Sequence, residues 1–123
     1  TRHYILPAAE GKYQAYLLET FNADGLITDA AINRKGEIVL LGYKNTGGKF
    51  WNCFLWIFRD AGSNRLAGNK YTRIELGSAL NLGQTEGLAF GEGERIWISS
   101  ERISHSWVHL PARLFKVDLS KSD

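Results

Sequence analysis

The sequence predicts an all-β fold of short antiparallel strands in four-stranded units. Aromatic and β-branched residues gather in short runs, and such residues favour strands. Thirteen glycines against two prolines indicate many tight turns and argue against long helices. The same order of strands and turns also recurs along the chain at a spacing of about 58 residues. These three observations together predict a repetitive β domain.

The repeat becomes visible when the chain is compared with itself at a shift of 58 positions. Lys12-Tyr13 then falls on Lys70-Tyr71. The further identities, which need no gap, are Leu18 with Leu76, Gly25 with Gly83, Ala31 with Ala89, and Ile38 with Ile96. With one residue of slippage, residues 55–58 also overlay residues 114–117.

Strands are expected wherever β-prone residues run between turn signals. The expected strands are residues 2–6, 13–21, 26–33, 37–43, 50–59, 71–76, 85–90, 95–100 and 113–119. Short turns at 34–36 and 91–93 and longer loops at 60–69 and 101–112 separate them. The expected organisation is the end of one unit at 1–25, a complete four-stranded unit at 26–77, and a last unit of three strands at 78–123.

Four-stranded units at a fixed period are typical of β-propeller blades. The first strand of each unit is rich in small residues, which suits an innermost strand near a crowded central axis; these residues are Ala30, Ala31, Gly87 and Ala89. The bulky strand that contains Trp56 and Phe58 suits the space between blades. The alternative is an ordinary meander that closes as a sandwich or a barrel.

Several segments carry a family resemblance, above all residues 25–31, 54–60 and 84–90 (Gln-Thr-Glu-Gly-Leu-Ala-Phe). They resemble uncharacterised secreted or envelope propellers of Bacteroidetes-type bacteria. The stretch 86–90 is also similar to the first blade strand of phytase-like and lactonase-like six-bladed propellers. The resemblance implies a periplasmic, outer-envelope or secreted parent of about six blades, of which this chain forms about two at the C-terminal end. The expected partners are the remaining blades of that parent or further copies of the chain.

Three carboxylates are the candidate metal ligands. Functional groups of propellers gather at one mouth of the central channel, and Asp29, Glu86 and Glu101 flank the strands expected to line it. Carboxylate oxygens there can hold Ca²⁺, and the resemblance to phytase-like and lactonase-like propellers implies such a site. The alternative is that Glu86 caps a turn or pairs with an arginine. Thr28 occupies the position of Glu86 in the preceding unit, so the acidic feature is not repeated.

The four tryptophans divide into two pairs. Trp51 and Trp107 lie near expected loops, where they can form a sugar-stacking surface for ligand binding, whereas Trp56 and Trp97 lie within strands and are expected in the core. The only cysteine, Cys53, lies in an apolar run, which predicts a buried, inert thiol and excludes an intrachain disulfide.

His105 and His109 lie in an expected loop. In an extended chain residues four apart lie about 13 Å from one another, which is too far to share a metal ion.

Composition excludes several functional classes. The net charge is only +2 and the charges are mixed, so no basic patch for nucleic acid is present. No apolar run reaches the roughly 18 residues of a membrane-spanning helix. There is no Gly-X-Ser-X-Gly motif or phosphate-binding glycine loop, and catalytic residues stay unassigned. The sequence therefore favours a non-catalytic propeller segment for binding or scaffolding. The alternative is part of a divalent-cation-dependent hydrolase similar to phytase-like or lactonase-like propellers.

Overall fold

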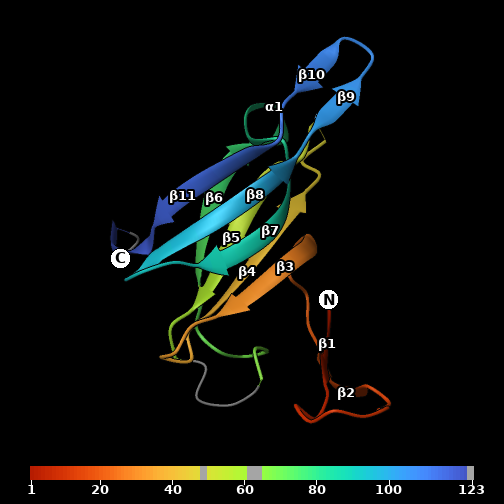
Figure 1. Ribbon diagram of the computed structural model, residues 1–123, viewed down its shortest axis with the longest axis vertical. Helices are drawn as coiled ribbons and strands as arrows, with labels where there is room; N and C mark the ends of the chain where they lie inside the picture. The colour runs from red at the N-terminus through yellow and green to blue at the C-terminus, as the bar shows by residue number, and fades with distance from the viewer. Residues whose placement is uncertain (48–49, 61–64, 122–123) are drawn as a thin grey trace.

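The computed structural model describes residues 1–47, 50–60 and 65–121, and it confirms an all-β fold with antiparallel sheets (Figure 1). The strand bounds differ from the expected ones by at most a few residues. The strands are β1 (Arg2–Ile5), β2 (Tyr16–Thr20), β3 (Leu26–Ile32), β4 (Ile38–Lys44), β5 (Asn52–Phe58), β6 (Thr72–Ser78), β7 (Gln84–Phe90), β8 (Arg95–Glu101), β9 (Ile103–His105), β10 (Val108–Leu110) and β11 (Arg113–Asp118).

The strands form two principal sheets and two hairpins. One sheet has four strands in the order β3-β4-β5-β6, and the other has three in the order β11-β8-β7. Strands β1 and β2 form one separate hairpin, and β9 and β10 form another that projects beyond the end of the three-stranded sheet (Figure 1). Strands β3 and β7, which are the first strands of the two sheets, lie side by side (Figure 1).

The hairpins β3–β4 and β7–β8 have the same register. Leu26 pairs with Tyr43, and Gln84 pairs with Glu101, each 58 positions further along the chain. All six residue pairs of the first hairpin recur at this spacing in the second. The third strand of each sheet follows the same scheme with one inserted residue. Strand β5 pairs with β4 and β11 pairs with β8, and corresponding residues of β5 and β11 lie 59 positions apart in the sequence.

The irregularities of the sheets recur as well. A β-bulge places Thr28 as an extra residue in β3, and a second bulge places Glu86 as an extra residue in β7, 58 positions later. The hairpins β1–β2 and β5–β6 also share a bulge, with Leu18 and Leu76 as the extra residues. A bulge bends its strand and redirects the neighbouring side chains, so corresponding strands bend at corresponding places.

The main core lies between the two sheets. Because side chains alternate between the faces of a strand, the strands that form this layer contribute every second residue to it. The buried members are Val39, Leu41, Leu55 and Ile57 from the four-stranded sheet, and Ile96, Ile98 and Leu119 from the three-stranded sheet and the segment that follows it. Leu119 belongs to a 3₁₀ turn, Leu119–Lys121.

A second apolar cluster covers the opposite face of the four-stranded sheet. Trp56 lies at its centre and is only 5% exposed, which confirms its expected place in the core. Its ring stacks on Tyr71 with 4.0 Å between ring centroids and 11° between planes. The other buried members are Leu40, Phe54, Phe58 and Leu66.

The expectation that Trp97 lies in the core is wrong. Its neighbours Ile96 and Ile98 face the four-stranded sheet, so the alternation along β8 turns Trp97 to the opposite face. Trp97 is 39% exposed, and Leu114 on the adjacent strand is 65% exposed. The Lys116 ammonium lies 5.8 Å from the centroid of the Trp97 ring. This face of the three-stranded sheet is therefore open in the described chain.

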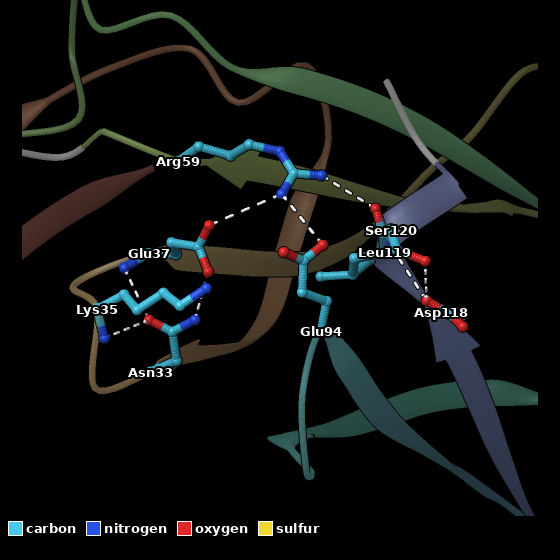
Figure 2. Close-up of polar contacts among 8 residues, drawn as sticks. All are labelled: Asn33, Lys35, Glu37, Arg59, Glu94, Asp118, Leu119 and Ser120. Carbon is cyan, nitrogen blue, oxygen red and sulfur yellow. Dashed lines mark hydrogen bonds and ion pairs between the residues drawn. The ribbon is translucent and has the colours of Figure 1, made fainter.

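Polar contacts join the two sheets at both ends of the layer. Near the start of β3, the Thr28 hydroxyl donates to the Thr85 carbonyl at 3.1 Å. At the far end, Arg59 donates to the Leu119 carbonyl at 3.0 Å and lies 3.7 Å from the carboxylates of Glu37 and Glu94 (Figure 2). Arg59 follows β5, whereas Glu94 and Leu119 flank the three-stranded sheet, so the guanidinium ties the sheets together.

Two short elements were not predicted from the sequence. A one-turn helix, α1 (Ala79–Leu82), follows β6; the Ser78 hydroxyl accepts from the Leu80 amide at its start, and Gly83 ends it. The segment expected as a loop at 101–112 instead contains the β9–β10 hairpin. Elements of three or four residues are too short to produce a recognisable hydrophobic period.

Glu19 attaches the β1–β2 hairpin to the rest of the fold. Its buried carboxylate accepts from the amides of Leu66 and Ala67 at 2.6 and 3.2 Å, and it bonds to the His3 ring at 2.9 Å. Burial raises the pKa of Glu19, but the His3 bond, both amides and the His3 charge together lower it overall. Stability from this group is therefore present above the ordinary glutamate pKa and is lost as pH falls through the lowered value.

Glu19→Gln should lower the free energy of unfolding at pH 7 by about 1–3 kcal/mol, because the two amides lose a charged acceptor. The deficit should shrink in acid, where the wild-type carboxylate becomes protonated. Urea denaturation at neutral and acidic pH measures both effects. Glu10→Gln, an exposed glutamate before β2, should change stability by less than about 0.5 kcal/mol. A Glu19→Gln deficit that stays the same in acid would contradict this account.

Candidate functional site: a pocket beside Trp51

A pocket of about 320 Å³ opens at the end of the sheets where α1 lies. In Figure 1, α1, the start of β7 and the start of β9 all lie at this end of the molecule. The end of β4 and the start of β5 complete the wall. The lining residues are Tyr43, Phe50, Trp51, Cys53, Ala79, Gly83, Gln84 and Ile103. The volume is at the lower limit of typical small-molecule sites.

Two aromatic rings form one wall of the pocket. Trp51 precedes β5 and is 42% exposed. Its ring meets Tyr43 in an edge-to-face arrangement, with 4.6 Å between centroids and 69° between planes. The Trp51 carbonyl accepts from the Ala79 amide at 2.8 Å, which holds the Trp51 backbone against α1. The Trp51 ring and the Trp51 backbone are therefore each held by one contact, while the residue remains partly exposed.

A connected set of polar groups borders this aromatic wall. The Gln84 side-chain amide donates to the Glu86 carboxylate at 2.7 Å, and Gln84 and Tyr43 both line the pocket. Burial raises the pKa of Tyr43, as do the nearby negative charge of Glu86 and the Cys53 thiol, whereas the Gln84 bond opposes the shift. Tyr43 therefore keeps its proton at neutral pH and presents a hydroxyl that can both donate and accept.

Cys53 lies beneath the pocket and is fully buried, which confirms its expected burial. The Thr85 hydroxyl donates to its thiol at 3.5 Å. Burial raises the pKa of Cys53, although the Thr85 bonds oppose this. A thiol that stays protonated is a poor nucleophile.

Gly83 forms the adjacent part of the wall, and its backbone requires glycine. Its φ of +82° is strained for other residues, and a Cβ there would lie 2.9 Å from the Ser100 hydroxyl oxygen. That oxygen is buried and has no hydrogen-bond partner among the described residues. The wall can therefore take no side chain at this position without displacing Ser100.

The structure separates the two tryptophans that were expected to bind ligand. Trp51 lines the pocket, whereas Trp107 lies in the turn between β9 and β10, outside the lining, and is 74% exposed. Ser106, beside Trp107, has a positive φ of 52°. The two rings therefore do not form one surface. Of the two, Trp51 alone lies among the residues that line the pocket.

The three candidate metal ligands have different surroundings. Both carboxylate oxygens of Asp29 accept backbone amides, from Ala30 at 2.8 Å and from Leu88 at 2.6 Å, so this side chain links β3 to β7. Glu86 bonds to Gln84, and Glu101 lies exposed at the end of β8. Within residues 1–47, 50–60 and 65–121, no three His, Cys, Asp or Glu side chains gather into a metal-binding group. The calcium site therefore stays a prediction, and no chemical step is derived through it.

The two expected loop histidines belong to the β9–β10 hairpin. His109 lies on β10, where its Nδ1 is 3.1 Å from the Ser104 hydroxyl oxygen. The His105 side chain lies outside the described part of the structure. The hairpin, rather than an extended loop, therefore determines how these two positions are related.

Sequence reasoning missed Tyr43 and Gln84. Gln84 stands two positions before the candidate Glu86, and Tyr43 ends a strand before a glycine-containing loop. Neither pattern by itself indicates a binding residue. Tyr43 and Gln84 meet because β4 and β7, which belong to different sheets, approach each other. No sequence pattern within either strand predicts this approach.

The comparisons with known proteins add no further information. No family model matches the chain, and no similar protein was found among curated proteins or solved structures. In the described part of the chain, no helix is long and apolar enough to cross a membrane. The chemistry of the site must therefore be argued from its own geometry.

Proposed function

We propose that this chain is part of a β-propeller and works as a non-catalytic binding module, with its ligand in the Trp51 pocket. The observation that carries the binding proposal is the pocket itself, which has an aromatic wall, a bordering polar network and uncharged described lining residues. Such a combination is typical of small-molecule sites, in which apolar walls provide contact and a few polar groups fix orientation.

The propeller part of the proposal is supported by strand register. The hairpins β3–β4 and β7–β8 repeat their pairing and bulges at a spacing of 58 residues, as adjacent blades would. Their first strands, β3 and β7, lie side by side, which suits innermost strands at a common axis. In this scheme β3–β6 is a complete blade, and β7, β8 and β11 are three strands of the next.

The surface supports a larger parent. The accessible area of 8323 Å² exceeds the roughly 6,600 Å² expected for a compact 13.8 kDa monomer. By register, Leu55 in the interface between the sheets corresponds to Leu114 on the open face of the three-stranded sheet. A further blade, from the parent or from another copy, would cover that face. The proposed extracytoplasmic location rests only on the resemblance of the strand motifs.

Binding is favoured over catalysis by the groups at hand. Cys53 is buried with a raised pKa, and Glu86 is held by the Gln84 amide. The hydrolase alternative depends on a metal, and Asp29, one of its three candidate ligands, has both oxygens bonded to backbone amides. The described residues therefore provide contact and orientation for a ligand more readily than a reaction.

Nuclear magnetic resonance of the ¹⁵N-labelled chain tests the proposal. A panel of neutral, cationic and anionic fragments should shift the backbone amides of Tyr43, Trp51 and Gln84 in at least one chemical class. Trp51→Ala should remove these shifts, and Trp97→Ala, on the open face of β8, should preserve them. Absence of shifts at the pocket for every fragment would overturn the binding proposal. Calcium-dependent hydrolysis of p-nitrophenyl phosphate or acetate, abolished by Glu86→Gln, would overturn its non-catalytic part.

A further inference from the structure

We infer that the Trp51 pocket binds a neutral sugar through a single hexose-sized ring. This inference rests on the proposed binding function and specifies the chemical class of the ligand. It follows from three properties of the pocket, namely a partly exposed tryptophan, polar groups that suit sugar hydroxyls, and a carboxylate, Glu86, bonded to the lining residue Gln84.

The aromatic face comes from Trp51. The Trp51 ring meets Tyr43 in an edge-to-face arrangement, its backbone carbonyl accepts from the Ala79 amide, and the residue is 42% exposed. The C–H groups on one side of a pyranose ring pack well against the electron-rich face of an indole. A held but accessible tryptophan therefore provides a platform for the apolar side of a sugar at little further loss of side-chain freedom.

The polar groups beside this platform match sugar hydroxyls. Each hydroxyl of a sugar is both a donor and an acceptor. The Tyr43 hydroxyl and the Gln84 amide offer both functions, and the Glu86 carboxylate accepts only. The Gln84 amide is bonded to Glu86, and Tyr43 and Gln84 line the same pocket as Trp51, so these groups form a polar edge beside the indole. Adjacent hydroxyls of a sugar can bond along such an edge.

The charge at the pocket argues against anionic ligands. The described lining residues carry no formal positive charge, and the Glu86 carboxylate accepts a hydrogen bond at 2.7 Å from the lining residue Gln84. A phosphate or carboxylate at this place would be repelled by Glu86. A quaternary ammonium ion is the main competitor, since aromatic rings and a carboxylate also attract cations. The polar edge favours the sugar, because an ammonium ion without N–H groups makes no use of Gln84 or Tyr43 as hydrogen-bond partners.

Titration of the ¹⁵N-labelled chain with methyl β-glucoside, methyl β-galactoside, glucose 6-phosphate and choline tests this inference. At least one methyl hexoside should bind at the pocket amides, and glucose 6-phosphate should bind about tenfold more weakly or not at all because of Glu86. Trp51→Ala should raise the dissociation constant of the hexoside about tenfold or more. Tyr43→Phe, which removes only the hydroxyl, should raise it about three- to tenfold.

Two further variants keep the result interpretable. Trp51→Phe retains an aromatic face and should lose much less affinity than Trp51→Ala. Trp97→Ala should bind the hexoside as the wild type does. Binding of choline in place of the hexosides would overturn the sugar inference and leave the binding function standing. If none of the four probes binds but other fragments still shift the pocket amides, the sugar inference is overturned and the binding function stands. Failure of every fragment and probe would overturn both.

Discussion

Leu55→Ala should lower the free energy of unfolding by about 2–5 kcal/mol. Leu55 is fully buried on β5, in the layer where the four-stranded and three-stranded sheets meet. Alanine would lose the burial of the isobutyl group and leave a cavity that the rigid sheets can fill only in part. Because the layer joins the two sheets, we expect the loss in their common unfolding transition. Urea denaturation followed by far-ultraviolet circular dichroism measures it.

Leu114→Ala provides a matched control. Leu114 corresponds to Leu55 in strand register, because Leu55 pairs with Leu41 on β4 and Leu114 pairs with Ser99 on β8. Unlike Leu55, however, Leu114 is 65% exposed. The same truncation should therefore change stability by less than about 0.5 kcal/mol in this chain. In the proposed parent propeller a further blade would cover this face, and Leu114→Ala should become costly there. Equal losses for Leu55→Ala and Leu114→Ala in the isolated chain would contradict the assignment of buried and open faces.

Trp56→Ala should be still more destabilising, by about 3–5 kcal/mol. Trp56 lies on the other face of β5 and packs on Tyr71, Phe21 and Phe58. Its removal would open a large cavity in the second cluster and separate aromatic neighbours that contact one another through it. Because Phe21 follows β2, we also expect the β1–β2 hairpin to lose order. Thermal unfolding and amide hydrogen exchange within β2 measure the two effects.

Trp107→Ala tests whether the loss comes from burial rather than from the removal of any tryptophan. Trp107 is 74% exposed in the β9–β10 turn, so its truncation should change stability by less than about 0.5 kcal/mol. Trp56→Phe is a second comparison. The Trp56 indole N–H is buried and has no partner in the described structure, so a phenyl ring would remove an unsatisfied donor along with some apolar contact. We expect Trp56→Phe to be much milder than Trp56→Ala, and similar losses for the two would contradict this explanation.

The strands were predictable because their signals are local. Alternating or continuous apolar runs between glycine-rich turns identify β3, β4, β5, β7 and β8 within one or two residues at each end. The shift of 58 positions found in the sequence is also the shift in strand register. The short helix α1 and the β9–β10 hairpin escaped prediction, since they are held by caps and pairing within a few residues rather than by a long pattern.

The site was predictable only in part. Proximity to a loop correctly singled out Trp51 as accessible, but the same reasoning grouped it with Trp107, which lies outside the pocket. Trp97 was misplaced because a position within a strand does not tell which face is covered. Asp29 was a candidate metal ligand at the mouth of a central channel; its carboxylate accepts from the Leu88 amide of the neighbouring sheet, a contact that the sequence did not indicate, and the metal site stays a prediction. In each case the surroundings of the side chain depend on which strand or sheet packs against it.

By itself, the sequence determined that this chain forms antiparallel strands with a repeated spacing, because strand formation depends on neighbouring residues and on turns. Only the tertiary structure decided which face of each sheet is buried, and that Tyr43 from one sheet and Gln84 from the other meet beside Trp51. The reason is that burial and side-chain contacts across sheets depend on how separate strands pack. The local pattern can limit that packing but cannot specify it.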